Sequence, residues 1–137
     1  MAVLLVLLVI VLPTTYASGS GVLIVNENVA TESLTKTEVM NIFLGKKATW
    51  ENGNKITFVT LKDGDTHKTF LRTYIRKTPE QFNYYWKRML FTGKGVIPKS
   101  FESDQEVIEF VSRNKNTVGY LSNPTTAAGI KMISIAE

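Results

Sequence analysis

Residues 55–75, KITFVTLKDGDTHKTFLRTYI, decide the fold class because a strand pattern gives way to a helix pattern within a few residues. The first seven residues alternate and are rich in β-branched side chains, which is typical of a β-strand. Residues 62–67 are polar and contain a glycine, as a turn does. Four apolar residues then recur at helical spacing: Phe70, Leu71, Tyr74 and Ile75. We expect a strand, a turn and a helix, the unit from which α/β domains are built.

The residues before this stretch show the same alternation. Residues 21–26, GVLIVN, are an apolar run bounded by turn formers, which predicts a strand buried on both faces. Thr35 and Glu38 stand at the spacing of a capping box, which marks a helix start. Gly45 is placed to end that helix in a left-handed conformation.

The residues after it predict two more helices and two strands. Thr78, Pro79 and Gln81 form one helix start, and Ser103 with Glu106 forms another. Residues 117–121 and 130–135 have strand patterns. The predicted order is β-α-β-α-α-α-β-β. We expect a single α/β layer sandwich with a mostly parallel sheet of four or five strands, flanked by helices on both faces.

The N-terminus predicts export. Residues 2–12 are almost wholly aliphatic, and about ten apolar residues are too few for a membrane-spanning helix, which needs roughly 20. Small residues follow, so we expect residues 1–17 to be a signal peptide and residues 18–137 to be one periplasmic or secreted domain. No Lys or Arg precedes the apolar run, so a start further upstream stays open. A buried N-terminal strand or an uncleaved anchor is the alternative.

Composition limits the function classes. The formal net charge is +4 at pH 7, which favours anionic partners modestly and is too weak to indicate nucleic acid. The chain has no cysteine, which removes thiol catalysis and cysteine-bound metals. His67 is the single histidine, and no carboxylates cluster beside it in a metal-binding pattern. No nucleophile motif, P-loop or dinucleotide fingerprint is present, so we expect neither an enzyme nor a cofactor.

Several segments together resemble phosphate-type substrate-binding proteins of ABC importers. They are Ile24-Val25-Asn26, the Ile42-Phe43-Leu44-Gly45-Lys46 block with Trp50, the strand and turn of residues 56–66, and Val118-Gly119-Tyr120. The resemblance covers nearly all of residues 18–137. It implies one lobe of a type II periplasmic binding protein, a phosphate or related oxyanion ligand, and an ABC permease as partner.

Two departures from the family's pattern concern the ligand. Family members have two lobes with the anion between them, whereas this chain has room for one. The family's Arg-x-x-Gly-Ser-Gly-Thr turn also differs here, because Leu61 stands at the Arg position. Asp65, Thr66 and His67 replace the Ser, Gly and Thr that follow the first Gly. The resemblance therefore implies the fold more strongly than it implies phosphate binding.

The strand-to-helix turn is the best candidate site in the sequence. A helix N-terminus offers unpaired N–H groups to an anion, and Thr66, His67 and Lys68 add donors or charge. The candidate ligand residues are Gly64, Asp65, Thr66, His67 and Lys68, with Asn26 added because ligands bind beyond the carboxyl ends of strands. The alternative is that Asp65 or Thr66 only caps the helix.

We therefore expect a non-catalytic exported solute-binding-like domain for ABC-type uptake of phosphate or a related oxyanion. A second copy of the chain or another protein would have to complete the cleft. The alternative is an envelope protein-interaction or sensory adaptor that has lost solute binding.

Overall fold

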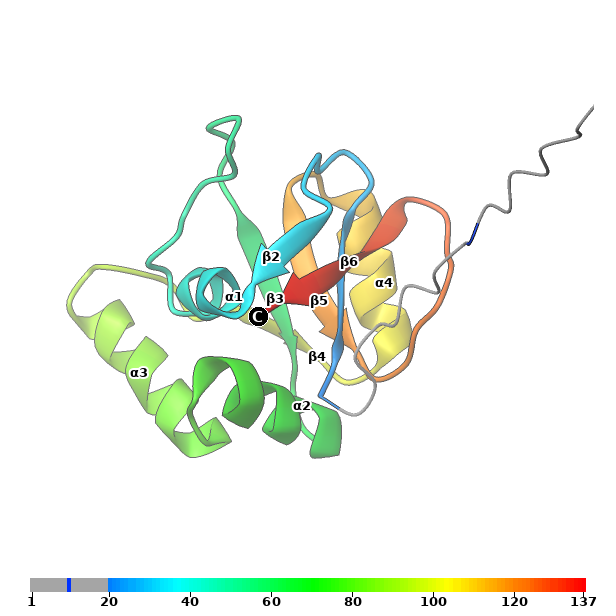
Figure 1. Cartoon of the computed structure of the whole chain (residues 1–137). Helices are drawn as coiled ribbons and strands as arrows, with labels where there is room; N and C mark the ends of the chain where they lie inside the picture. Colours follow the sequence, from blue (N-terminus) through cyan, green and yellow to red (C-terminus); the bar gives the residue numbers. More distant parts are fainter. Residues whose placement is uncertain (1–9, 11–19) are drawn as a thin grey trace, which may run out of the picture.

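The computed structural model describes Ile10 and residues 20–137, and these form one six-stranded sheet with helices packed on it (Figure 1). The strand order is β2-β6-β1-β5-β3-β4. The strands are β1 (Val22–Asn26), β2 (Ser33–Thr35), β3 (Thr57–Leu61), β4 (Lys99–Phe101), β5 (Thr117–Leu121) and β6 (Ile130–Ala136). Apart from Ile10, the predicted signal peptide of residues 1–17 lies outside the described residues, so it stays a prediction.

The helices begin where the sequence predicts them. They are α1 (Lys36–Phe43), α2 (Asp65–Phe70), the π-helical turn η1 (Leu71–Ile75), α3 (Pro79–Phe91) and α4 (Asp104–Arg113). Thr35 and Thr78 each complete a capping box, with Glu38 and Gln81 respectively. Ser103 caps α4 by accepting a hydrogen bond from the Glu106 N–H. The Glu106 carboxylate reaches the N–H of Glu102 instead of that of Ser103.

The α/β fold class is confirmed, and the sheet differs in two details from the sequence prediction. It has six strands because β2 and β4, of three residues each, join its two edges. Such short strands carry too few residues to show a period. Three of the strand pairings are parallel, β2–β6, β3–β4 and β3–β5, whereas β1 runs antiparallel to both neighbours. The direction of β1 matters for the site described below.

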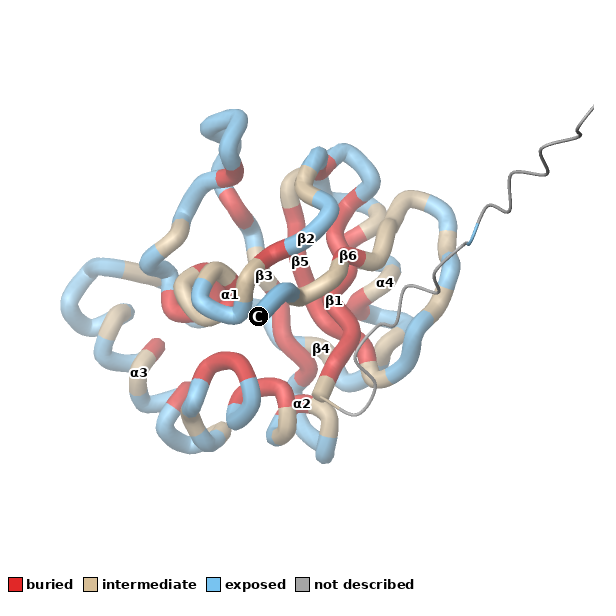
Figure 2. Tube along the Cα trace, in the orientation of Figure 1, coloured by how far each residue is buried: buried red, intermediate tan, exposed pale blue. Residues whose placement is uncertain are grey.

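The helices cover both faces of the sheet. On one face, α4 packs so closely that a Cβ on Gly119 of β5 would lie 3.0 Å from the Val107 side chain. On the other face, Tyr120 stacks on Phe70 of α2 with ring centroids 3.8 Å apart, and Phe43 of α1 lies beside both. Adjacent residues of β5 thus serve opposite layers, as the pleat requires. Figure 2 shows the buried residues following the central strands between these layers.

Helix α3 lies at one end of the molecule and is attached through two aromatic side chains. The indole N–H of Trp86 donates to the Phe43 carbonyl at 3.1 Å, and the Tyr85 hydroxyl donates to the Leu44 carbonyl at 2.6 Å. Gly45, with φ +73°, allows this approach because a Cβ there would lie 2.8 Å from the Trp86 ring. Among the described residues, none of the helices has both the length and the apolar character needed to span a bilayer.

Candidate functional site

The candidate turn lies at the edge of the sheet where three strands end. Because β3 is parallel to both β4 and β5, Leu61, Phe101 and Leu121 all bring their carboxyl ends to this edge. The chain is tied across it by a 2.7 Å hydrogen bond from the Lys62 N–H to the Phe101 carbonyl. Loops that follow such strand ends are the usual place for ligands in α/β sheets.

The start of α2 is open to solvent and has no side-chain cap. Gly64 is the N-cap residue, has φ +97°, and carries no side chain that could accept from the first turn. The other three α-helices in the described part of the chain are each capped by a Thr or Ser side chain. The N–H groups at the start of α2 therefore stay available, since the first N–H groups of a helix have no partner within it. The interpretation in which Asp65 or Thr66 caps this helix finds no support in its geometry.

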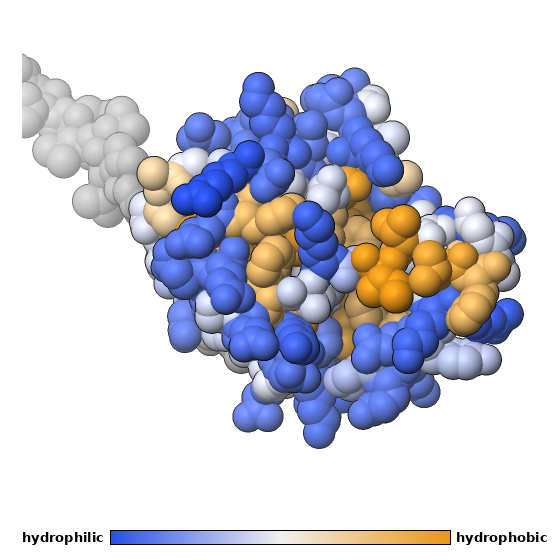
Figure 3. All heavy atoms as spheres, turned by 180° about the vertical axis from the view of Figure 1, so that it is seen from behind, coloured by the Kyte–Doolittle hydropathy of each residue, from blue (hydrophilic) through white to orange (hydrophobic). Residues whose placement is uncertain are grey.

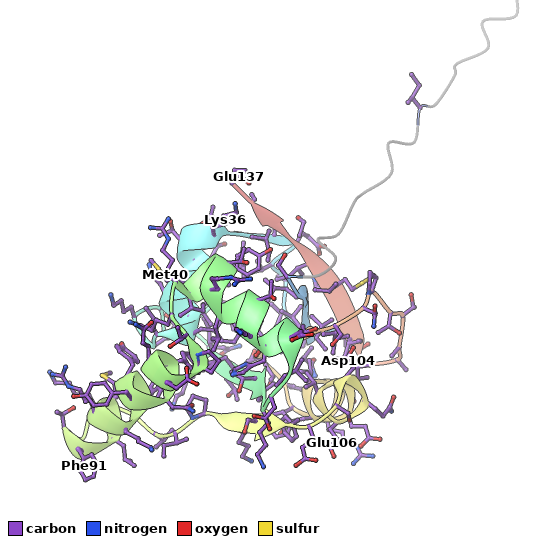
Figure 4. The ribbon with its side chains drawn as sticks, turned by 90° about the horizontal axis from the view of Figure 1, so that it is seen from below. Lys36, Met40, Phe91, Asp104, Glu106 and Glu137 are labelled. Atoms are coloured by element: carbon purple, nitrogen blue, oxygen red, sulfur yellow. The ribbon has the colours of Figure 1, made fainter. Side chains whose placement is uncertain are left out.

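A surface hollow of about 390 Å³ opens at this edge. It is bounded by the β3–α2 turn, the start of α4 and the residues after β5, and its lining residues are Leu61, Asp63, Gly64, Asp65, Thr66, Glu102, Ser103, Asp104, Ser122 and Asn123. Figure 4 labels Asp104 and Glu106 at the start of α4, beside this hollow. The hollow thus joins the starts of two helices with the end of a third strand.

Four carboxylates give the hollow a negative lining: Asp63, Asp65, Glu102 and Asp104. Two of them have partners. Lys62 lies 3.5 Å from Glu102 in an exposed ion pair, and both oxygens of Asp104 accept from the Ser122 N–H at 2.9 and 3.0 Å. The second contact fixes the start of α4 to the end of β5. The hollow is therefore rich in hydrogen-bond acceptors, with donors supplied by backbone N–H groups and by Ser and Thr hydroxyls.

His67 points away from the hollow and into the core. The side chain is buried, and its Nδ1 is hydrogen-bonded to the Tyr120 hydroxyl. That hydroxyl also accepts from the Leu61 N–H at 3.1 Å, so it donates its own proton to His67. His67 is then neutral and carries its proton on Nε2.

The electrostatic surroundings agree with this proton arrangement. Burial lowers the pKa of His67, and the nearby Asp63 carboxylate offsets this only in part. Burial likewise raises the pKa of Tyr120, against the effect of the Leu61 N–H. Both groups are thus uncharged at neutral pH. The pair holds the β3–α2 turn against β5 instead of offering a charge to a ligand.

The predicted ligand residues divide into three sets. Gly64, Asp65 and Thr66 line the hollow together. Lys68 is exposed on α2 but does not line it, and His67 lies beneath it. Asn26 lies at the opposite edge of the sheet, because β1 is antiparallel to β5 and its carboxyl end points away from the turn.

Asn26 has a structural role at that opposite edge. The amide donates to the Val111 carbonyl at 2.8 Å, and its Oδ1 accepts from the Asn28 N–H at 2.9 Å. The reasoning that placed Asn26 near the ligand assumed a parallel β1, and the antiparallel pairing removes that basis. We therefore leave Asn26 out of the proposed site.

Residues from two other loops join the hollow, and the sequence analysis did not include them. Ser122 and Asn123 follow β5, while Glu102 and Ser103 precede α4. Their position directly after predicted strands was the available signal, since parallel strands end at one edge. Within residues 20–137, His, Asp and Glu side chains do not gather into any group of three or more that could hold a metal ion.

Sequence comparisons leave the chain unassigned, because no protein-family model and no curated protein matches it. Solved structures do match. A protein from Clostridium perfringens, named as a phosphate ABC transporter substrate-binding protein and solved with bound phosphate, has a TM-score of 0.63 at 19% identity over 85% of this chain. PstS from Borrelia burgdorferi gives 0.62 at 19% over 89%, and an ABC-type phosphate transport receptor from Vibrio cholerae gives 0.56 at 16% over 85%.

The matches cover only part of those proteins. This chain spans 44%, 49% and 46% of the three structures, respectively. The likeness supports the fold predicted from the sequence, and at such identities it extends to the fold alone. In architecture, the chain resembles one lobe of a phosphate-type substrate-binding protein.

Proposed function

We propose that this chain is a non-catalytic, exported solute-binding domain that takes phosphate or a related oxyanion for ABC-type uptake. The observation that carries the proposal is the match of 85–89% of the chain to three proteins named for phosphate transport. The hollow at the β3–α2 turn is the site that the proposal assigns to the ligand.

The donors for an oxyanion come from the β3–α2 turn. The uncapped first turn of α2 directs backbone N–H groups to solvent, and Thr66 adds a hydroxyl. Gly64 has nothing within 4 Å of the position of a Cβ, so the approach to these N–H groups is open. This arrangement resembles the backbone-lined anion sites found after strands in many α/β proteins.

The carboxylates determine which form of the ligand fits. Asp65 and Asp63 would repel a fully ionised oxyanion but can accept a hydrogen bond from a protonated one. Hydrogen phosphate has such a proton, whereas sulfate has none at neutral pH. We therefore expect phosphate to bind in preference to sulfate.

A single lobe leaves the ligand open to water on one side. Ligand sites typically bury most of the ligand surface, which a hollow of about 390 Å³ on one lobe does not do. A second copy of this chain or another envelope protein would supply the other wall. Affinity in the isolated domain should therefore be weak, in the millimolar range to which about −4 kcal/mol corresponds.

Calorimetric titration of residues 18–137 with phosphate and with sulfate tests the proposal. The expected result is saturable one-site binding of phosphate, weaker binding of sulfate, and a changed phosphate affinity in an Asp65→Ala variant. Glu51→Ala is the matched control, because Glu51 is an exposed carboxylate that lines a different hollow, beside Trp50. A folded sample that gives no heat at millimolar phosphate would contradict oxyanion binding by this domain.

An interaction domain of the cell envelope is the second candidate function. An exposed apolar cluster on α3 and the following loop favours it, because isolated soluble domains seldom display such side chains together. The two functions use opposite parts of the molecule, so a domain with a silent titration and an active α3 surface would be an adaptor.

A further inference from the structure

Four apolar side chains form the exposed end of α3 and of the loop after it. We call this group the apolar tip: Leu90, Phe91, Val96 and Ile97. Phe91 is 89% exposed and Val96 is 75% exposed, so the tip contributes almost nothing to the core. Figure 3 shows apolar side chains gathered at this end of the molecule, and Figure 4 shows Phe91 pointing away from the body.

The loop that carries the tip has a defined backbone. The N–H of Lys94 donates to the Met89 carbonyl at 2.9 Å, and that of Gly93 donates to the Leu90 carbonyl at 3.1 Å. Gly95 then packs under the buried Trp86, where a Cβ would lie 2.9 Å from the ring. Val96 and Ile97 are thus held outward by a fixed turn. Little conformational entropy remains to be lost when a partner covers them.

A cationic groove of about 510 Å³ runs along α3 next to the tip. Its lining includes Arg76, Lys77, Arg88 and Lys94 together with Tyr84 and Tyr85, and it contains no carboxylate. Lys77 lies 5.5 Å from the centre of the Tyr85 ring. In the described part of the chain, the three ion pairs involve Lys36, Lys62 and Lys131, so the cations of the groove have no salt-bridge partner.

The charge of the protein is concentrated on this side. Residues 76–99 hold six of the sixteen Lys and Arg residues but one of the twelve Asp and Glu residues. The modest net charge of +4 therefore hides a strongly positive end and an acidic hollow elsewhere. Such a separation attracts polyanions to α3 without any effect at the β3–α2 turn.

We propose that the apolar tip and the cationic groove form a docking surface for an anionic phospholipid membrane. Cations of one sign at headgroup level with aromatic and aliphatic side chains beyond them are the pattern of interfacial binding. Tyr84, 65% exposed among the cations, suits the same layer because its ring is amphipathic. An acidic protein would also meet the cations, but it would not need apolar side chains displayed on a projecting turn.

Vesicle binding measures this directly. Residues 18–137 should sediment with vesicles of equal parts phosphatidylcholine and phosphatidylglycerol, and not with phosphatidylcholine alone. Each cation near an anionic surface contributes about fivefold to the partition coefficient. Lys87→Gln, Arg88→Gln and Lys94→Gln combined should therefore lower it roughly a hundredfold. A double variant, Phe91→Ser with Ile97→Ser, should lower it at least about tenfold at unchanged net charge.

Controls separate the membrane from other partners. Lys55→Gln with Lys115→Gln removes two exposed cations from the opposite end of the molecule and should leave strong binding in place. All altered side chains are exposed, so circular dichroism should show an unchanged fold. Equal binding to neutral vesicles, or full binding by the Phe91/Ile97 variant, would overturn the proposal. A soluble acidic peptide that binds as tightly as the vesicles, with no loss in that variant, would identify a protein partner instead.

Discussion

Replacing Tyr120 with Phe tests the buried hydrogen-bond chain that holds the β3–α2 turn. The hydroxyl bridges the Leu61 N–H and the His67 Nδ1, and all three residues are buried. Phe keeps the ring that stacks on Phe70 at 3.8 Å, so packing is conserved while two buried polar groups lose their partner. Each unsatisfied group costs about 1–3 kcal/mol, and we expect a total loss of about 3 kcal/mol.

Chemical denaturation followed by circular dichroism gives the free energy of unfolding. For a domain of this size, a loss of about 3 kcal/mol corresponds to a decrease in Tm of roughly 12 °C. Tyr74→Phe is the matched control, because Tyr74 also packs on Phe70, with centroids 5.3 Å apart, and its hydroxyl makes no hydrogen bond to another described residue. The control should change stability by less than about 0.5 kcal/mol. Equal effects of the two substitutions would refute the bridging role of the Tyr120 hydroxyl.

Three further predictions follow from the same part of the molecule. Burial holds the pKa of His67 below that of the unfolded chain, so the free energy of unfolding should fall as the pH drops below about 6.5, by at most about 1.4 kcal/mol per pH unit. Denaturation series at several pH values should show this slope in the parent and a flatter one in His67→Gln, which lacks a histidine; the same slope in both would exclude His67 as its source. Gly119→Ala places a Cβ 3.0 Å from Val107 and should cost about 1–3 kcal/mol by the same measurement, and a neutral result would mean that α4 can shift away from the sheet. Asp104→Asn removes a charge-assisted contact to Ser122 and should cost about 1 kcal/mol, while calorimetry should show tighter phosphate binding because the hollow loses a negative charge; weaker binding would show that this carboxylate accepts a hydrogen bond from the ligand.

Local patterns predicted the elements well. Thr35 with Glu38 and Thr78 with Gln81 fixed two helix starts, because a capping box depends only on residues three apart. The strand of residues 117–121 and the turn at Gly64 were also predictable from a few neighbouring residues. The two edge strands β2 and β4 were missed, because three-residue strands are defined by their partner in the sheet.

The sequence by itself determined the α/β class, the helix starts, and the turn that carries Gly64, Asp65 and Thr66. Tertiary structure alone decided what surrounds that turn. The antiparallel direction of β1 placed Asn26 at the far edge, and the packing of β5 turned His67 inward to Tyr120. The physical reason is that caps and periodicity arise from neighbours in the chain, whereas strand direction and side-chain partners depend on contacts between residues as much as 85 positions apart, such as Asn26 with Val111.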